Sequence, residues 1–296
     1  MILPPLPAPD ADPWSIDPFA YPGLETVDAL RPARAPYRNE NPDAPALVLI
    51  PGLTMDSRDY IRQLPLGAVA DIHTLQANNN AVDGEESFGH FARHVEEYIL
   101  AQKLEERPGG FVIGGSSMGG AISLAICARG RVNPRGLVLI GSFANCMHLP
   151  FYQRFFAPLS WYLPLDFAKH SLRVFSRFVR NSRGALGQDL RFMWSRHLHH
   201  THGYYGRAIM ALTRQNQIPQ IQKFTLPTLV IHGTNDWVLP YSAGVEMSKA
   251  IPGARLVTID GAGHILFYTH ANAVNSAMAE FLDTLTTKRA DNVNER

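Results

Sequence analysis

Short apolar runs alternate with helical patterns along most of the chain after residue 45. Each run is rich in Val, Ile and Leu and is closed by glycine, proline or asparagine, which is typical of strands buried on both faces of a sheet. The runs are Ala46–Ile50, Asp71–Gln76, Phe111–Ile113, Leu137–Ile140, Leu229–Ile231 and Leu256–Ile259. Apolar positions at helical spacing lie between several of them, in the ranges 88–104, 121–128 and 271–287. This alternation predicts an α/β fold in which helices flank a mostly parallel central sheet.

Three stretches fall outside this alternation and divide the chain. Residues 1–45 hold 11 of the 22 prolines, and because proline lacks an amide donor, we interpret them as a proline-rich N-terminal arm. Residues 146–223 lack an obvious buried strand, which predicts an insertion between two strands of the sheet. The core then comprises residues 46–145 and 224–288. We expect a flexible tail at the C-terminal end, over residues 289–296.

The sharpest chemical signal lies where a predicted strand meets a predicted helix. Gly115, Ser117 and Gly119 form the pattern G-x-S-x-G, in which a strained turn lifts the serine hydroxyl above the sheet edge. A serine nucleophile needs a base, and the base needs an orienting carboxylate. Asp236 and His264 follow two later predicted strands, in the order that a strand-to-helix serine requires. Taken singly, Asp236 could be an ordinary turn or helix-capping residue and His264 an ordinary loop residue. The inference of a catalytic role rests on finding all three residues in the expected order, each next to a predicted strand.

These motifs resemble the α/β-hydrolase superfamily over about residues 46–285. The resemblance implies a cofactor-independent serine hydrolase, with Ser117 as the nucleophile, His264 as the general acid and base, and Asp236 as the partner that orients the histidine. It also implies that the insertion at residues 146–223 is a helical cap. A serine at position 117 also excludes the haloalkane dehalogenases and epoxide hydrolases of this fold, which need a carboxylate there.

The same resemblance implies an oxyanion hole made by the main-chain amides of Met118 and Leu53. Leu53 follows Pro51 and Gly52, where the family commonly has His-Gly. Because the donor is a main-chain amide, this departure leaves the hole available. By analogy with deletions of known donors, each amide is worth about 3–4 kcal/mol to the transition state.

Residues 151–223 differ in composition from the remainder of the chain. They contain 11 Lys and Arg, only two acids (Asp166 and Asp189) and 13 of the 29 aromatic residues. Their net charge is therefore +9 against −8 for the remainder, although the whole chain carries only +1. Because the chain is not basic throughout, we expect no nucleic-acid partner. Residues 171–183 predict a basic amphipathic helix, either packed on the core or in weak contact with anionic lipid.

The aromatic residues of the cap favour a carboxylic ester with an apolar acyl group as the small-molecule substrate. A carbon–carbon bond hydrolase or a thioesterase with the same three residues is the alternative, and a non-catalytic binding protein is a third hypothesis. The identity of the ester and the oligomeric state stay open.

We expect no metal site and no cofactor. Four histidines gather in residues 195–203, but they lack the i, i+4 spacing that a helical metal site favours. The two cysteines cannot form a disulfide framework and fit a reducing compartment. The first residues lack the features of a secretory signal, and no apolar stretch is long enough to span a bilayer, so the sequence predicts a cytoplasmic protein.

Overall fold

Six parallel strands form one sheet in the order β2-β1-β3-β4-β5-β6. The computed structural model describes residues 41–53, 57–75, 88–149, 184–197 and 211–294, together with Asn39, Met55, Phe151 and Arg154. The strands are β1 (Ala46–Ile50), β2 (Asp71–Thr74), β3 (Phe111–Ser116), β4 (Gly136–Ile140), β5 (Thr228–Gly233) and β6 (Arg255–Ile259). The sheet confirms the predicted fold class and the position of all six predicted strands.

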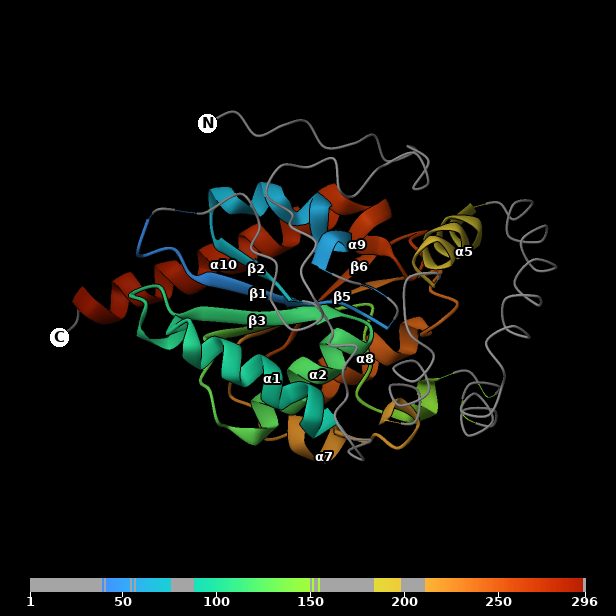
Figure 1. Ribbon diagram of the computed structural model, residues 1–296, viewed down its shortest axis with the longest axis horizontal. Helices are drawn as coiled ribbons and strands as arrows, with labels where there is room; N and C mark the ends of the chain where they lie inside the picture. Colours follow the sequence, from blue (N-terminus) through green and yellow to red (C-terminus); the bar gives the residue numbers. More distant parts are fainter. Residues whose placement is uncertain are drawn as a thin grey trace.

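Helices cover both faces of this sheet (Figure 1). One face carries α1 (Phe88–Ala101), α2 (Met118–Arg129) and α8 (Tyr241–Ala250), and the other carries the 3-10 helix η1 (Ser57–Ala68), α9 (Leu266–Thr269) and α10 (Ala271–Asn294). Shorter turns are η2 (Leu104–Glu106), η3 (Cys146–His148) and α7 (Ile218–Ile221). Helix α5 (Gly184–His197) lies at the end of the molecule toward which the strands point (Figure 1).

Strand β1 shows why both faces need a helical layer. Its alternate residues Ala46, Val48 and Ile50 pack in the core on the side of α1 and α2. Leu47 and Leu49 pack in the core on the side of η1 and α10. Successive side chains of a strand point to opposite faces, so a wholly apolar strand is stable only between two layers.

Strand β6 departs from the expected burial on both faces. It pairs only with β5, and within it only Ile259 is buried. Edge position alone does not explain this exposure, because β2 at the opposite edge of the sheet is buried at all four of its positions.

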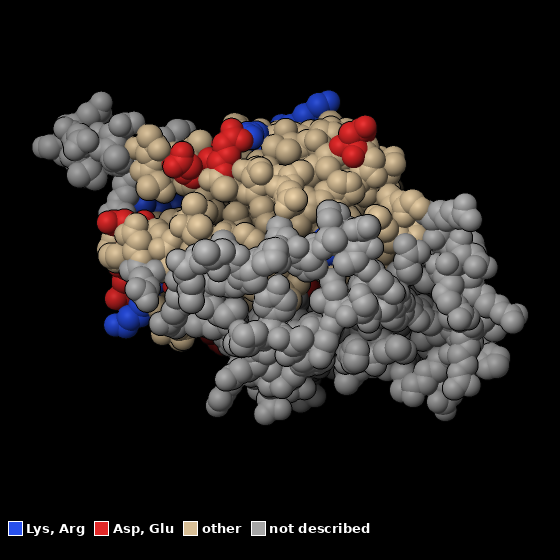
Figure 2. Space-filling view, turned by 90° about the horizontal axis from the view of Figure 1, so that it is seen from above, with Lys and Arg blue, Asp and Glu red and all other residues tan. Residues whose placement is uncertain are grey.

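Much of the predicted arm and cap falls outside the described residues. This holds for residues 1–38 and for residues 155–183, which include the predicted basic helix at 171–183. Helix α10 continues through Asn294, so most of the segment that we expected to be a flexible tail is helical. Among the described residues, no helix combines the length and apolarity needed to span a lipid bilayer. Figure 2 shows acidic and basic side chains scattered over a mostly uncharged described surface.

Close packing of α2 against β1 gives a test of the fold. A Cβ atom at Gly119 would overlap the carbonyl oxygen of Ile50, which cannot move without disturbing the sheet. We expect Gly119→Ala to lower the free energy of unfolding by about 1–3 kcal/mol in urea denaturation. Ala128→Ser, at an exposed position of the same helix, should change it by less than about 0.5 kcal/mol. Equal effects of the two substitutions would contradict the close approach.

Candidate active site

Ser117 occupies a strained turn between β3 and α2. Its φ of 52° and ψ of −119° lie in a region that residues with a side chain rarely adopt. Two hydrogen bonds to the next strand and its loop hold this turn. The Ser117 amide donates to the carbonyl of Ile140 at 2.9 Å, and the Ser142 hydroxyl donates to the carbonyl of Ser117 at 2.8 Å.

Glycine at positions 115 and 119 makes the turn sterically feasible. A Cβ at either position would overlap the carbonyl oxygen of Ile50, and one at Gly115 would also lie 2.7 Å from the carbonyl carbon of Gly119. The G-x-S-x-G pattern is therefore the condition under which β1, β3 and α2 meet beneath the serine.

The two adjacent serines have different environments. Ser116 is 2% exposed, and its hydroxyl lies 3.2 Å from the hydroxyl of Tyr60. Ser117 is partly exposed, and within the described structure its hydroxyl makes no capping hydrogen bond to α2, although serine often caps helices. Ser117 is thus the serine of this pair that can meet a substrate.

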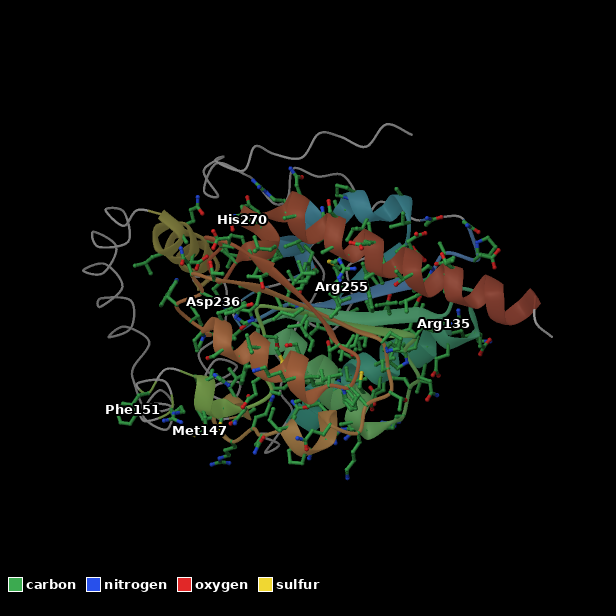
Figure 3. All side chains as sticks on the ribbon, turned by 180° about the vertical axis from the view of Figure 1, so that it is seen from behind. Arg135, Met147, Phe151, Asp236, Arg255 and His270 are labelled. Atoms are coloured by element: carbon green, nitrogen blue, oxygen red, sulfur yellow. The ribbon has the colours of Figure 1, made fainter. Side chains whose placement is uncertain are left out.

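Asp236 and His264 form a buried hydrogen-bonded pair. Asp236 follows β5, and its Oδ2 accepts a hydrogen bond from Nδ1 of His264 at 2.8 Å. Its Oδ1 accepts from the amides of Val238 and Leu239 at 2.9 and 2.8 Å, so the loop fixes the orientation of the carboxylate. Nε2 of His232 lies 3.4 Å from Oδ2 of Asp236. Figure 3 shows Asp236 at the same end of the molecule as α5.

The charges of this pair shift both pKa values. Burial favours the neutral form of Asp236, but the charge of His264 and the hydrogen bonds from His232 and His264 outweigh it and hold the pKa of Asp236 well below its usual range. Burial likewise opposes the charged form of His264. The charge of Asp236, its hydrogen bond and the charge of Asp189 nevertheless raise the pKa of His264 above its ordinary value.

The end of β4 lies between Ser117 and the acid–base pair. Gly141 follows Ile140, whose carbonyl oxygen accepts the hydrogen bond from the Ser117 amide. A Cβ at Gly141 would lie 3.2 Å from the carbonyl oxygen of His264 and 3.5 Å from Oδ2 of Asp236. Asp236 and His264 therefore lie against Gly141, and Ser117 is hydrogen-bonded to the residue before it. The contacts of the described residues join Asp236 to His264 directly and do not include a hydrogen bond between Ser117 and His264.

The two residues predicted for the oxyanion hole lie beside Ser117. Met118 is the first residue of α2. Leu53 follows Gly52, where a Cβ would lie only 3.2 Å from Cβ of Ser117. The loop after β1 therefore passes next to the serine, as an amide donor from this loop requires. The donor roles of Met118 and Leu53 stay predictions.

Sequence reasoning missed Asp189, which lies on α5 and contacts the His264 loop. The feature of the sequence that could have revealed it is that Asp189 is one of only two acidic residues among the many aromatic and basic residues of 151–223. In the described part of the chain, no three His, Cys, Asp or Glu side chains form a group that could hold a metal ion. Of the histidine cluster, His197 ends α5, whereas His199, His200 and His202 fall outside the described residues.

The chain belongs to the α/β-hydrolase family, because the model of the alpha/beta hydrolase fold matches residues 45–271. A pimeloyl-acyl-carrier-protein methyl ester esterase of Neisseria meningitidis serogroup C is 25% identical over 174 residues, which are 57% of this chain and 68% of that protein. The putative non-heme bromoperoxidase BpoC of Mycobacterium tuberculosis is 38% identical over 66 residues, 22% of this chain and 25% of that protein. The match to the curated relatives that are 38–40% identical to this chain spans a quarter or less of their length.

The fold is also similar to that of solved structures. A thermophilic esterase from Thermogutta terrifontis aligns with a TM-score of 0.67 at 19% identity, over 82% of this chain and 90% of that one. At this identity the likeness shows the fold alone, so the chemistry of the site has to be argued from its own residues.

The raised pKa of His264 gives a direct test of the acid–base pair. We expect the imidazole to titrate above pH 6.5 in the wild-type protein and at lower pH in Asp236→Asn, because burial remains while the charge is lost. Nuclear magnetic resonance of the histidine side chains measures both values, and His264→Gln identifies the resonance. An unchanged titration in Asp236→Asn would contradict the pairing.

Proposed function

We propose that this protein is a serine hydrolase that cleaves carboxylic esters through an acyl-enzyme on Ser117. The observation that carries the proposal is the buried hydrogen bond between Asp236 and His264, near a serine held in a strained turn. Each residue then has one role: Ser117 attacks, His264 transfers protons and Asp236 orients the imidazole.

The reaction proceeds in two acyl transfers. Ser117 Oγ attacks the ester carbonyl while Nε2 of His264 takes its proton. His264 then gives that proton to the departing alcohol, which leaves an acyl group on Ser117. A water molecule, deprotonated by His264, attacks the acyl carbonyl, and the acid leaves as the proton returns to Ser117. The hydrogen bond from Nδ1 to Asp236 selects the tautomer that leaves Nε2 free to accept.

Main-chain amides supply the electrostatic stabilisation. The amides of Met118 and Leu53 donate to the oxyanion that develops at the carbonyl oxygen, each contributing about 3–4 kcal/mol. Helix α2 begins at Met118, so its positive end adds to this field. The methyl ester esterase among the relatives supports the choice of an ester bond, and the aromatic composition of residues 151–223 supports an apolar acyl group.

Labelling with a fluorophosphonate tests the nucleophile, and a series of nitrophenyl esters of increasing acyl length tests the substrate class. We expect Ser117→Ala to abolish labelling and to lower kcat by at least about 1,000-fold, because the nucleophile is gone. Ser116→Ala is the matched control: it should keep the label, since the Ser116 hydroxyl is buried beside Tyr60. Full turnover by Ser117→Ala, or no turnover of any ester in the series, would refute the proposal.

Charge favours a second candidate substrate, an acyl group carried by an acidic protein. Residues 151–223 carry a net charge of +9, and one relative acts, by its name, on an acyl-carrier-protein ester. A segment with this charge would attract an acidic carrier over several ångströms and raise the rate of encounter. An ester or thioester bond on such a carrier uses the same three residues.

Ionic strength separates the two substrates. For an acyl group on an acidic carrier protein, we expect kcat/KM to fall about tenfold or more between 50 and 500 mM salt, because salt screens the attraction. The same acyl group as its methyl ester, which carries no charge, should change by less than about twofold. Parallel salt dependence for both substrates in steady-state kinetics would exclude a role for the positive segment in carrier binding.

A further inference from the structure

Helix α5 places one carboxylate between the two loops that carry Asp236 and His264. Asp189 is 0% exposed, and its Oδ2 accepts hydrogen bonds from the indole nitrogen of Trp237 at 2.9 Å and from the amide of His264 at 2.6 Å. Its Oδ1 accepts from the amide of Ile265 at 3.0 Å. The donors come from both loops, so one side chain bridges them.

The main chain before His264 approaches the Asp189 carboxylate closely. A Cβ at Gly263 would overlap the Asp189 carboxylate, so the glycine before His264 is what allows the contact. One turn further along α5, Phe192 packs against Phe267 and Tyr268, with ring centroids 6.0 and 4.9 Å apart. Helix α5 is therefore seated on α9 directly beyond the His264 loop.

We propose that Asp189 is a positioning residue, which fixes the main chain at His264 and thereby holds the imidazole against Asp236 and couples α5 to the general base. The inference rests on the proposed serine hydrolase function. An ionised carboxylate accepts all three hydrogen bonds through its lone pairs, whereas the side-chain amide of asparagine would turn an N–H donor toward one of these donors. A buried charge is tolerated only when such partners satisfy it, which explains the convergence of three donors.

The charge of Asp189 also acts on His264. It is one of the influences that raise the pKa of the imidazole, after the charge and hydrogen bond of Asp236. Burial raises the pKa of Asp189 itself to about 6, opposed by the charge of His264 and the two amides and reinforced by the charge of Asp236. Among the described residues, His264 and Asp236 are the charged groups that act on Asp189.

Asp189→Asn tests the proposal. We expect kcat to fall about 10–100-fold, because small displacements of a catalytic group are costly, with KM changed less than about threefold. We also expect the acid limb of the kcat/KM profile to move to lower pH, since a negative charge near His264 is lost. Phe192→Leu is the matched control: it loosens the packing of α5 but keeps the carboxylate, so its acid limb should stay in place. If Asp189→Asn loses only stability, as Phe192→Leu does, and its acid limb is unmoved, the proposal is wrong.

Trp237→Phe keeps the test open if Asp189→Asn fails to fold. It retains an aromatic ring but removes one donor, which favours protonation of Asp189. Between pH 8 and pH 6 we expect its kcat to fall about 2–10-fold more than that of the wild-type protein. A profile identical to the wild type would overturn the proposal.

Failure of the proposed function would look different. Ser117 would then not react with the fluorophosphonate, whereas the titration of His264, followed by magnetic resonance, would still report on positioning. We expect that titration to move to lower pH in Asp189→Asn and to stay in place in Phe192→Leu. An unchanged titration in Asp189→Asn would overturn the inference independently of any activity.

Discussion

The close approach of α2 to β1 is the constraint on which the site depends. The carbonyl oxygen of Ile50 lies where a side chain at Gly115 or Gly119 would have to be, so strand and helix meet without side chains between them. This contact forces the turn at Ser117 into its unusual conformation. The strain persists because the buried sheet on one side and the hydrogen bonds to Ile140 and Ser142 on the other leave the turn no alternative.

The sequence predicted the sheet and the proximity of the three candidate site residues because both depend on local patterns. A strand such as β1 is apolar at every position since both of its faces are covered, and that composition is visible without coordinates. Ser117, Asp236 and His264 each follow such a strand, and the carboxyl ends of parallel strands meet at one edge. Their proximity therefore follows from topology.

What the sequence could not predict depends on packing between distant segments. The partial exposure of β6 contrasts with the full burial of β2 at the opposite edge of the sheet, and the order of strands along the chain specifies neither. The role of Asp189 depends on how α5 is seated beside the His264 loop, 75 residues further along the chain. An acidic residue in a helix is ordinarily solvated, and only the three donors around Asp189 distinguish it from that default.

Two buried carboxylates contact one histidine, and their environments differ. Asp236 receives the proton-bearing Nδ1 of His264, and the charges around it keep it ionised far into the acid range. Asp189 contacts the main chain of the same residue, and burial brings its pKa to about 6. When their environments drive the pKa values of two neighbouring groups apart in this way, each group can take a different task. In the proposed mechanism Asp236 sets the tautomer and basicity of the imidazole. In our proposal Asp189 sets where the imidazole lies, and it does so from the segment that separates β4 from β5. Under this proposal, a substrate that displaced α5 would act on His264 without touching it.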